Sequence, residues 1–385
     1  MQVEVIPLMS PSPGTSRQLN VFRFGGSLPG PTIYLQAGLH ADEWPGLLVL
    51  QHLLEQLEAI ERRQELCGTV IVVPYANPVG MSQNLFGYVT GRFDMTGTGN
   101  FNRNYLDPYP EIKRLIEGKL TDNKIQNQHL IRAAFVEAVR EWRVDDEVGF
   151  LKKTLLALST EADVVLDLHC DDRTEAHLYG VKHQADECVA LAACLGFSYV
   201  FLEDLEGIVA FDGAHLQFWH RLQLDYPEKP IGLPVFAVTL EYRGQIDVED
   251  SLAQSDASRL LAYLRSLGVY KPDTNLETEL VAGGLAPEAV RVSPLEAVDT
   301  VKASAAGLVV FSRALGSFVK AGERFAEIVQ IDHPAPNRRI AVNAIADGYI
   351  VGLSHRRLVR PGDQIAKIAG ATALPHRQLG NLLQL

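Results

Sequence analysis

The stretch that decides the fold is TIYLQAGLHADEWPG, residues 32–46. Its first residues form a short apolar run that predicts a strand, and an apolar helix is expected from about residue 45 to residue 60. His40 and Glu43 lie between the two, at the carboxyl end of the strand. Open α/β sheets place their ligands at this end of their strands. We therefore interpret this His-x-x-Glu pair as half of a zinc site.

Strands and helices alternate along most of the remaining chain. Two short strands are expected within residues 1–30, and buried strands are expected at 69–73, 162–169, 199–202 and 235–241. Helices are expected in the block 106–160 and at about 185–195 and 250–267. This alternation indicates an α/β fold, with a mixed and mostly parallel sheet flanked by helices.

The sequence pattern changes after about residue 285, where long helical periods end and short Val/Ile/Leu runs alternate with glycine. A weak repeat relates GLVV, VKAGE and FAEI in residues 307–328 to GYIV, VRPGD and IAKI in residues 348–368. Each half predicts a strand, a turn and a strand, and two halves make a small β-barrel or sandwich. This part resembles a biotinyl/lipoyl-like domain without a modifiable lysine. We expect two domains, residues 1–285 and 286–385.

The composition is that of an ordinary globular protein and argues against some partners. The formal net charge of −12 disfavours nucleic-acid binding, which needs a basic face to meet phosphates. The four cysteines form no Cys-x-x-Cys pair, so reduced thiols are expected. The amino terminus lacks a signal-peptide pattern, and no stretch approaches the ~20 apolar residues of a membrane helix. We expect a cytoplasmic protein with no membrane partner, and the sequence leaves open whether it forms a homo-oligomer.

A catalytic zinc site has three protein ligands, so a third residue is needed besides His40 and Glu43. His169 fits, because it ends an apolar strand and precedes a polar turn. Asp167 lies two residues earlier, on the same side of that strand, and is expected to orient a nearby group. Glu241 ends another apolar strand and is the candidate for the base that takes a proton from water.

The segment 87–105 is rich in Gly, Asn and Thr without a clean period, and it is predicted to be a loop. Loops at strand ends often carry functional residues. Arg92, Asn102 and Arg103 lie in this segment and would supply donors to an oxyanion and to a substrate carboxylate. A guanidinium matches a carboxylate in a fork geometry that lysine cannot offer.

Other reactive residue types have simpler interpretations. His177, His215 and His220 have no partner motif, and each is expected to be solvated or hydrogen-bonded. Cys170 follows a candidate ligand without an activating group and is expected to be a small buried residue. Arg243 fits a structural ion pair and a substrate contact equally well.

Taken together, the motifs resemble the succinylglutamate desuccinylase/aspartoacylase family of the zinc carboxypeptidase superfamily. The resemblance covers, in order, roughly residues 30–270. The motifs that carry it are Gly38-x-His40-x-x-Glu43-x-x-Gly46, Asn77-Pro78, Asn102-Arg103, Asp167-Leu168-His169 and Glu241 at a strand end.

The resemblance assigns a role to each candidate residue. It implies one zinc ion per chain, with the ligands His40, Glu43 and His169. It implies that Glu241 is the general acid/base and that Arg92 polarises the scissile carbonyl. It also implies that Asn102 and Arg103 bind the substrate carboxylate.

We predict a zinc-dependent amidohydrolase at 1–285 that removes the acyl group from an N-acyl amino acid or a similar small carboxylate-bearing amide. One alternative is a metallocarboxypeptidase acting on peptides, which an open groove at the site would favour. The other is a non-catalytic binding protein of the same fold, with the β-rich tail as its interaction module. The complete ligand set and Glu241 argue against this last alternative.

Overall fold

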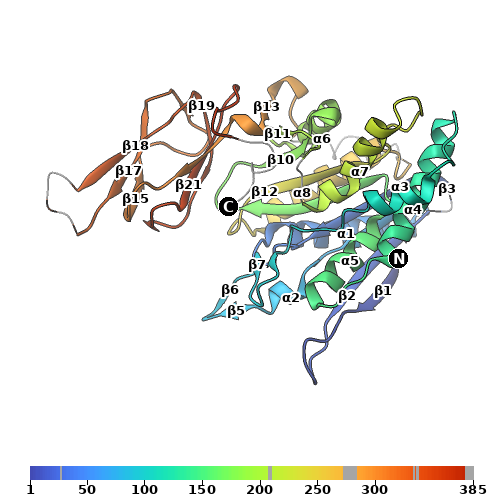
Figure 1. The fold of residues 1–385 in the computed structure, drawn as a ribbon. Helices are drawn as coiled ribbons and strands as arrows, with labels where there is room; N and C mark the ends of the chain where they lie inside the picture. Colours follow the sequence, from blue (N-terminus) through green and yellow to red (C-terminus); the bar gives the residue numbers. More distant parts are fainter. Residues whose placement is uncertain (27, 207–209, 272–283, 333, 335–337, 378–385) are drawn as a thin grey trace. The chain divides into compact units, whose positions relative to one another are not determined.

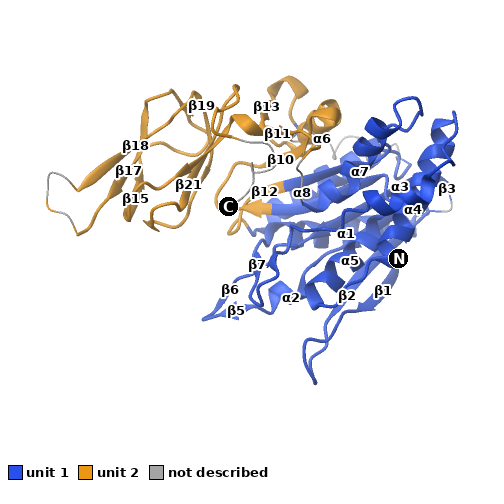
Figure 2. Cartoon of the chain, in the orientation of Figure 1, with its two compact units in different colours: residues 1–169, 208–240, 248–284 blue, residues 170–207, 241–247, 285–385 orange. Residues whose placement is uncertain are grey.

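A computed structural model describes residues 1–26, 28–206, 210–271, 284–332, 334 and 338–377. The chain forms two compact units (Figure 2). Unit 1 comprises residues 1–169, 208–240 and 248–284, and unit 2 comprises residues 170–207, 241–247 and 285–385. The domain boundary expected at residue 285 stays a prediction.

The strands of unit 1 follow the order β1-β2-β4-β3-β9-β12. Figure 1 labels β1, β2, β3 and β12 of this set. In chain order they are β1 (Gln2–Pro7), β2 (Gln18–Gly25), β3 (Leu28–Ala37), β4 (Cys67–Val73), β9 (Val164–Asp171) and β12 (Phe236–Gly244). β3 pairs in parallel with β4 and β9, whereas β2 pairs antiparallel with β1 and β4. The chain enters unit 2 within β9, after His169, and within β12, after Leu240. The predicted mixed, mostly parallel α/β sheet is confirmed.

Helices cover both faces of the sheet in unit 1. The helices of unit 1 are α1 (Pro45–Arg62), α2 (Pro78–Met81), α3 (Tyr109–Ile116), α4 (Lys124–Glu141), α5 (Glu147–Ser159), α7 (Phe211–Asp225) and α8 (Asp250–Ser266). α1 packs against α8 and lies on the face to which Ala37 and Leu168 point, because a Cβ at Gly46 would approach both side chains. Side chains alternate across a strand, so Tyr34 points to the opposite face, where it contacts Phe211 of α7.

The block predicted to be helical, residues 106–160, consists of α3, α4 and α5. In this block α4 packs against both α3 and α5. Asn123 caps α4 by accepting a hydrogen bond from the amide of Gln126, and Asp146 caps α5 in the same way. No helix in the described part of the chain is long and apolar enough to cross a membrane.

Unit 2 begins with a parallel set of strands and ends with two antiparallel sheets. The parallel set contains β10 (His177–Val181), β11 (Tyr199–Glu203) and β13 (Arg291–Pro294), with α6 (Ala185–Leu195) between the first two strands in the chain. One antiparallel sheet has the order β14-β21-β19-β16, from strands Val298–Lys302, Gln364–Ala369, Gly348–Leu353 and Phe318–Val319. The other has the order β18-β17-β15-β20, from strands Arg339–Asn343, Arg324–Val329, Gly307–Phe311 and Leu358–Val359.

The two halves of the sequence repeat form these two sheets together, and each half contributes one short strand that pairs with the other half. β16 from the first half pairs with β19 of the second, and β20 from the second half pairs with β15 of the first. Gly307 and Gly348 begin the equivalent long strands, and a Cβ at these positions would lie 2.4 Å and 2.5 Å from a backbone oxygen of the neighbouring strand. The predicted β-rich C-terminal part is confirmed.

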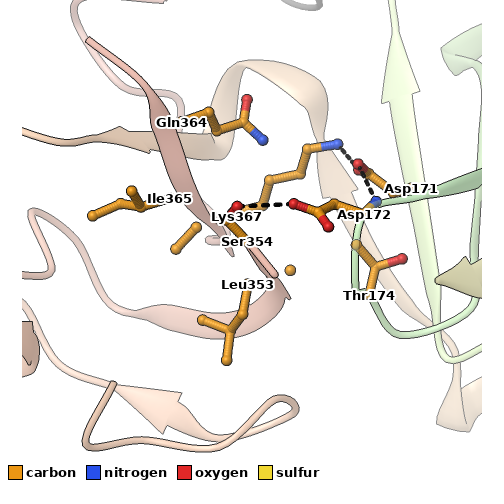
Figure 3. Close-up of a pocket in the computed structure, with 10 residues that line it drawn as sticks. Asp171, Asp172, Thr174, Leu353, Ser354, Gln364, Ile365 and Lys367 are labelled. Atoms are coloured by element: carbon orange, nitrogen blue, oxygen red, sulfur yellow. Dashed lines mark hydrogen bonds and ion pairs between the residues drawn. The ribbon is translucent and has the colours of Figure 1, made fainter. Parts of the chain in front are cut away.

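The end of β9 and the turn that follows it are held against the sheet β14-β21-β19-β16 inside unit 2 (Figure 3). Lys367 of β21 forms an ion pair with Asp171, and the Ser354 hydroxyl donates to a carboxylate oxygen of Asp172 at 2.9 Å. Backbone hydrogen bonds join residues 173–175 to β19. Side-chain and main-chain contacts therefore fix this turn together.

We expect Gly46→Val to lower the free energy of unfolding by about 1–3 kcal/mol, because a larger side chain overpacks a close contact. A Cβ at Gly46 would already lie 3.0 Å from Cβ of Leu168 and 3.3 Å from Cβ of Ala37, and neither atom can rotate away. Urea unfolding measures the change. Glu55→Val, on the exposed side of the same helix, is the control. Equal unfolding midpoints for the two variants would contradict the close packing of α1 on the sheet.

Candidate metal centre

The connection between β3 and α1 carries two of the candidate ligands in unit 1. β3 ends at Ala37, and Gly38 turns the chain with a φ of 70°, a conformation that favours glycine. Pro45 opens α1, where its missing amide hydrogen costs no hydrogen bond. His40 and Glu43 lie between these points, and each is only 3% exposed. The local sequence therefore buries both side chains at the end of the strand.

His40, Glu43 and His169 bring their polar atoms together. Nδ1 of His40 lies 2.9 Å from Oε1 of Glu43, and Nδ1 of His169 lies 2.7 Å from Oε2 of the same carboxylate. One ligand atom from each residue lies within 4.8 Å of the other two. β9, which carries His169, is the parallel neighbour of β3, so both strands end at the same edge of the sheet.

The Nε2 atoms of the two histidines are bound by other side chains. Nε2 of His40 lies 2.8 Å from Oδ1 of Asn100, and Nε2 of His169 lies 2.9 Å from Oδ2 of Asp167. Oxygen acceptors at both Nε2 positions favour a hydrogen there, which leaves the Nδ1 atoms directed at Glu43. Asp167 therefore lies beside the His169 ring, and its predicted role as an orienting carboxylate stays a prediction.

Burial and neighbouring charges shift the pKa values of all three side chains in the cluster. Burial lowers the pKa of His40 to about 4, and the nearby Arg92 guanidinium lowers it as well. Burial would also lower the pKa of His169, but Asp167 and Glu43 outweigh it and raise this pKa well above its usual value. Burial raises the pKa of Glu43, yet the two histidines outweigh it, so this pKa lies well below its usual value. The carboxylate is therefore ionised and His40 neutral near pH 7.

The donor set fits a divalent metal ion. With hydrogens on both Nε2 atoms, the Nδ1 lone pair of neutral His40 faces Oε1 of Glu43, and a cation relieves the repulsion between two acceptors. Ligand histidines bind metals as neutral rings, with their other nitrogen donating to a carboxylate or another oxygen. A metal ion at Nδ1 of His169 would take the place of the proton that Glu43 and Asp167 stabilise there.

Arg92 lies beside this cluster, between two short hairpins. Its Nη1 is 3.0 Å from Oε1 of Glu43 and 3.4 Å from Nδ1 of His40. The hairpins are formed by β5 (Asn84–Leu85) with β6 (Tyr88–Val89) and by β7 (Phe93–Asp94) with β8 (Gly99–Asn100). The prediction that residues 87–105 form a loop is therefore wrong at β6, β7 and β8. Strands of two residues are too short to produce an alternating sequence pattern.

Asn102 and Arg103 follow the second hairpin and also lie in unit 1. Nδ2 of Asn102 is 3.4 Å from Nε2 of His169, and its Oδ1 accepts a hydrogen bond from the amide of Phe211 at 2.8 Å. Nη1 of Arg103 donates to the carbonyl oxygen of Asn102 at 2.7 Å. Their predicted contact with a substrate carboxylate stays a prediction.

Glu241 belongs to the short stretch of β12 that is part of unit 2. There its charge acts on two neighbours in the same unit, the Lys367 ammonium and the Tyr179 hydroxyl. Its predicted role as general acid/base stays a prediction.

The structure confirms that His177 and His215 are hydrogen-bonded and that Cys170 is buried. His215 is buried, with Nδ1 2.9 Å from the carbonyl oxygen of Phe211 and Nε2 2.8 Å from Oγ of Ser159. Nδ1 of His177 lies 2.7 Å from a backbone carbonyl oxygen. Cys170 is 1% exposed, and none of the four cysteines, all within the described residues, forms a disulfide.

Two residues of the site were not singled out in the sequence. Asn100 holds His40, but it sits in a Gly/Thr-rich turn with no pattern that distinguishes it. Gln36 donates to Oδ1 of Asp167 at 3.0 Å and accepts a hydrogen bond from the Tyr34 hydroxyl at 2.8 Å. Its position in an otherwise apolar strand end was a usable signal, since a buried amide needs partners.

The chain matches one family model and is similar to solved structures. Residues 29–221 match the family model described as the succinylglutamate desuccinylase/aspartoacylase catalytic domain. The chain is similar to a solved structure of a succinylglutamate desuccinylase/aspartoacylase family protein from Shewanella amazonensis, with 26% identity, a TM-score of 0.80, and coverage of 96% of this chain and 98% of that one. A structure from Shewanella frigidimarina, described as a succinylglutamate desuccinylase/aspartoacylase, has 24% identity and a TM-score of 0.82, and the match covers 96% of each chain. The product-bound structure of the ectoine utilization protein EutE from Ruegeria pomeroyi has 17% identity and a TM-score of 0.63, and the match covers 96% of this chain and 95% of that one. No curated protein matches the chain.

We expect the protein to bind one divalent metal ion per chain, and His169→Ala to weaken that binding by more than about 100-fold. Loss of a mere partner of a ligand already costs about 10–100-fold in affinity. Competition with a chromophoric chelator, together with elemental analysis, measures the effect. His183→Ala removes an exposed histidine and serves as the control. Equal metal content in the two variants would exclude His169 from the ligand set.

Proposed function

The chain belongs to the succinylglutamate desuccinylase/aspartoacylase family, and from this membership we propose that it is a zinc-dependent hydrolase that removes the acyl group from an N-acyl amino acid. Membership of the family implies deacylase activity. The observation that carries the finer proposal is the convergence of His40, Glu43 and His169 in one buried cluster. Two histidines and one glutamate are a ligand set of catalytic zinc sites.

The ligands and their partners prepare the site for the ion. Nδ1 of His40, Nδ1 of His169 and the Glu43 carboxylate would hold the metal. Asn100 and Asp167 fix the orientation of the two rings through their Nε2 atoms. When bound, zinc would lower the pKa of a water molecule towards ~7 and polarise the substrate carbonyl.

The remaining residues would move protons and hold the substrate. Glu241 would accept a proton from the attacking water and pass it to the amine nitrogen as the amide C–N bond breaks, releasing a carboxylic acid and an amino acid. Arg92 would donate hydrogen bonds to the carbonyl oxygen as negative charge develops on it. Arg103, with Asn102 beside it, would bind the substrate carboxylate, because a guanidinium offers parallel donors to both oxygens.

A screen of the zinc-loaded protein against N-acetyl, N-succinyl and N-formyl amino acids tests the proposal. We expect release of the free amine from at least one class, detected with an amine-reactive dye. We also expect Glu241→Gln to lower kcat by about 10²–10⁴-fold while zinc content stays unchanged, since the base is lost and the ligands remain.

Glu249→Gln is the matched control, because Glu249 is an exposed glutamate near the same strand end and makes no capping hydrogen bond at α8. No turnover of any substrate class by the zinc-loaded protein would contradict the proposed activity. Turnover by Glu241→Gln equal to that of the control would remove Glu241 from the mechanism and leave the activity itself standing.

We expect Arg103→Lys to raise KM by about 10-fold or more with a smaller change in kcat, because lysine replaces a two-point contact by a point charge. Steady-state kinetics on the best substrate of the screen separates the two constants. Arg114→Lys, on the exposed side of α3, is the control for loss of a surface guanidinium. An unchanged KM in the Arg103 variant would show that the substrate carboxylate binds elsewhere.

A further inference from the structure

Lys152 is a buried lysine on α5 that no step of the proposed reaction uses. The residue is only 4% exposed. Lysine is almost never buried to this degree without an anionic partner. Among the described residues its ammonium forms no ion pair and instead donates to the backbone of a single loop.

That loop consists of residues 100–105 and is called the 100–105 loop below. Nζ of Lys152 lies 2.6 Å from the carbonyl oxygen of Arg103 and 3.4 Å from that of Asn100. It also lies 5.7 Å from the centre of the Tyr105 ring, within the range of a cation–π contact. Contacts from the beginning, middle and end of the loop therefore converge on one ammonium.

The 100–105 loop carries polar groups of the site and has little regular structure of its own. Oδ1 of Asn100 lies 2.8 Å from Nε2 of His40 and accepts a hydrogen bond from the amide of Asn102, also at 2.8 Å. Asn104 has a φ of 57°, in the left-handed region, so the chain turns sharply after Arg103. A loop of this kind needs partners outside itself, and Lys152 supplies them.

The position of this ammonium is unfavourable by itself. Burial lowers the pKa of Lys152 to about 8, although Asp146 and Asp94 act in the opposite direction. The next residue, Lys153, is only partly buried and also donates to two carbonyls, those of Arg140 at 2.8 Å and Trp142 at 2.6 Å, at the end of α4. Two adjacent lysines thus make the same kind of contact, and only Lys152 makes it under the loop that reaches the metal centre.

We propose that Lys152 is the positioning residue of the 100–105 loop, fixing Asn100 against His40 and Arg103 towards the substrate. The part that concerns Arg103 rests on the proposed function. The part that concerns Asn100 depends only on the histidine that it holds. This role gives the helical block a function, because α5 delivers the ammonium to the loop.

The test compares Lys152→Met, Lys152→Arg and Lys153→Met in the full-length protein. Methionine keeps an unbranched stem but removes the donors. We expect amides of the 100–105 loop in Lys152→Met to exchange with deuterium about 10-fold faster than in Lys153→Met, since a local opening becomes easier. We expect zinc affinity to fall by about 10-fold, because His40 loses its fixed partner. KM should rise more than kcat falls, and Lys152→Arg should recover part of each effect.

Exchange rates and zinc affinity in Lys152→Met equal to those in Lys153→Met would overturn the proposal. If Lys152→Met does not fold, Lys152→Leu, which also removes the donors, takes its place, and the same equality would overturn the proposal there. The exchange readout needs neither metal nor substrate. Failure of the proposed function would therefore appear as an inactive parent protein, while the loop measurement still supports or rejects the role of Lys152.

Discussion

The Glu43 carboxylate is the group on which the geometry of the site depends. Its two oxygens face Nδ1 of His40 and Nδ1 of His169, so one side chain fixes the separation of the two rings. A carboxylate buried to this degree is unfavourable unless it is paired and hydrogen-bonded. The fold meets this requirement through register, since Ala37 of β3 pairs with Leu168 of β9 and both strands deliver their next residues to the same edge. A slip of one residue would turn His169 to the other face of the sheet.

The two candidate ligand histidines have different partners at Nε2, and their pKa values shift in opposite directions. His169 lies between the carboxylates of Glu43 and Asp167, both of which favour its charged form. His40 instead has the neutral amide of Asn100 behind it and the Arg92 guanidinium nearby, so its neutral form is favoured. The alternation of β9 explains the first arrangement, because residues two apart share a face. The second arrangement arises from a segment that approaches from outside the sheet.

This difference also explains how far the sequence could predict the site. The elements β3, α1 and β9 have clear periodicity and end signals, so His40, Glu43, Asp167 and His169 could be located from strand ends alone. Asn100 and Lys152 could not, because their contacts join segments about 50–60 residues apart through irregular backbone and leave no periodic pattern. The two hairpins within residues 84–100 were missed because strands of two residues are too short to produce an alternating sequence pattern. The C-terminal repeat did predict a small β-barrel or sandwich. It could not predict that β16 pairs with a strand of the second half and β20 with a strand of the first, because this pairing depends on tertiary contacts.

The site is therefore built on two kinds of support. The candidate ligands follow strand ends whose positions are fixed by the sheet, where displacement costs many backbone hydrogen bonds at once. Residues 92–103, which include Arg92, Asn100 and Arg103, are held mainly by individual side chains, among them Asp94, which accepts hydrogen bonds from the hydroxyls of Thr96 and Thr98. Changes to such single contacts can reshape the segment while the strand ends that carry the candidate ligands stay in place. The candidate ligands and the residues proposed to bind substrate therefore depend on different parts of the fold, and Asn100 links the two through His40.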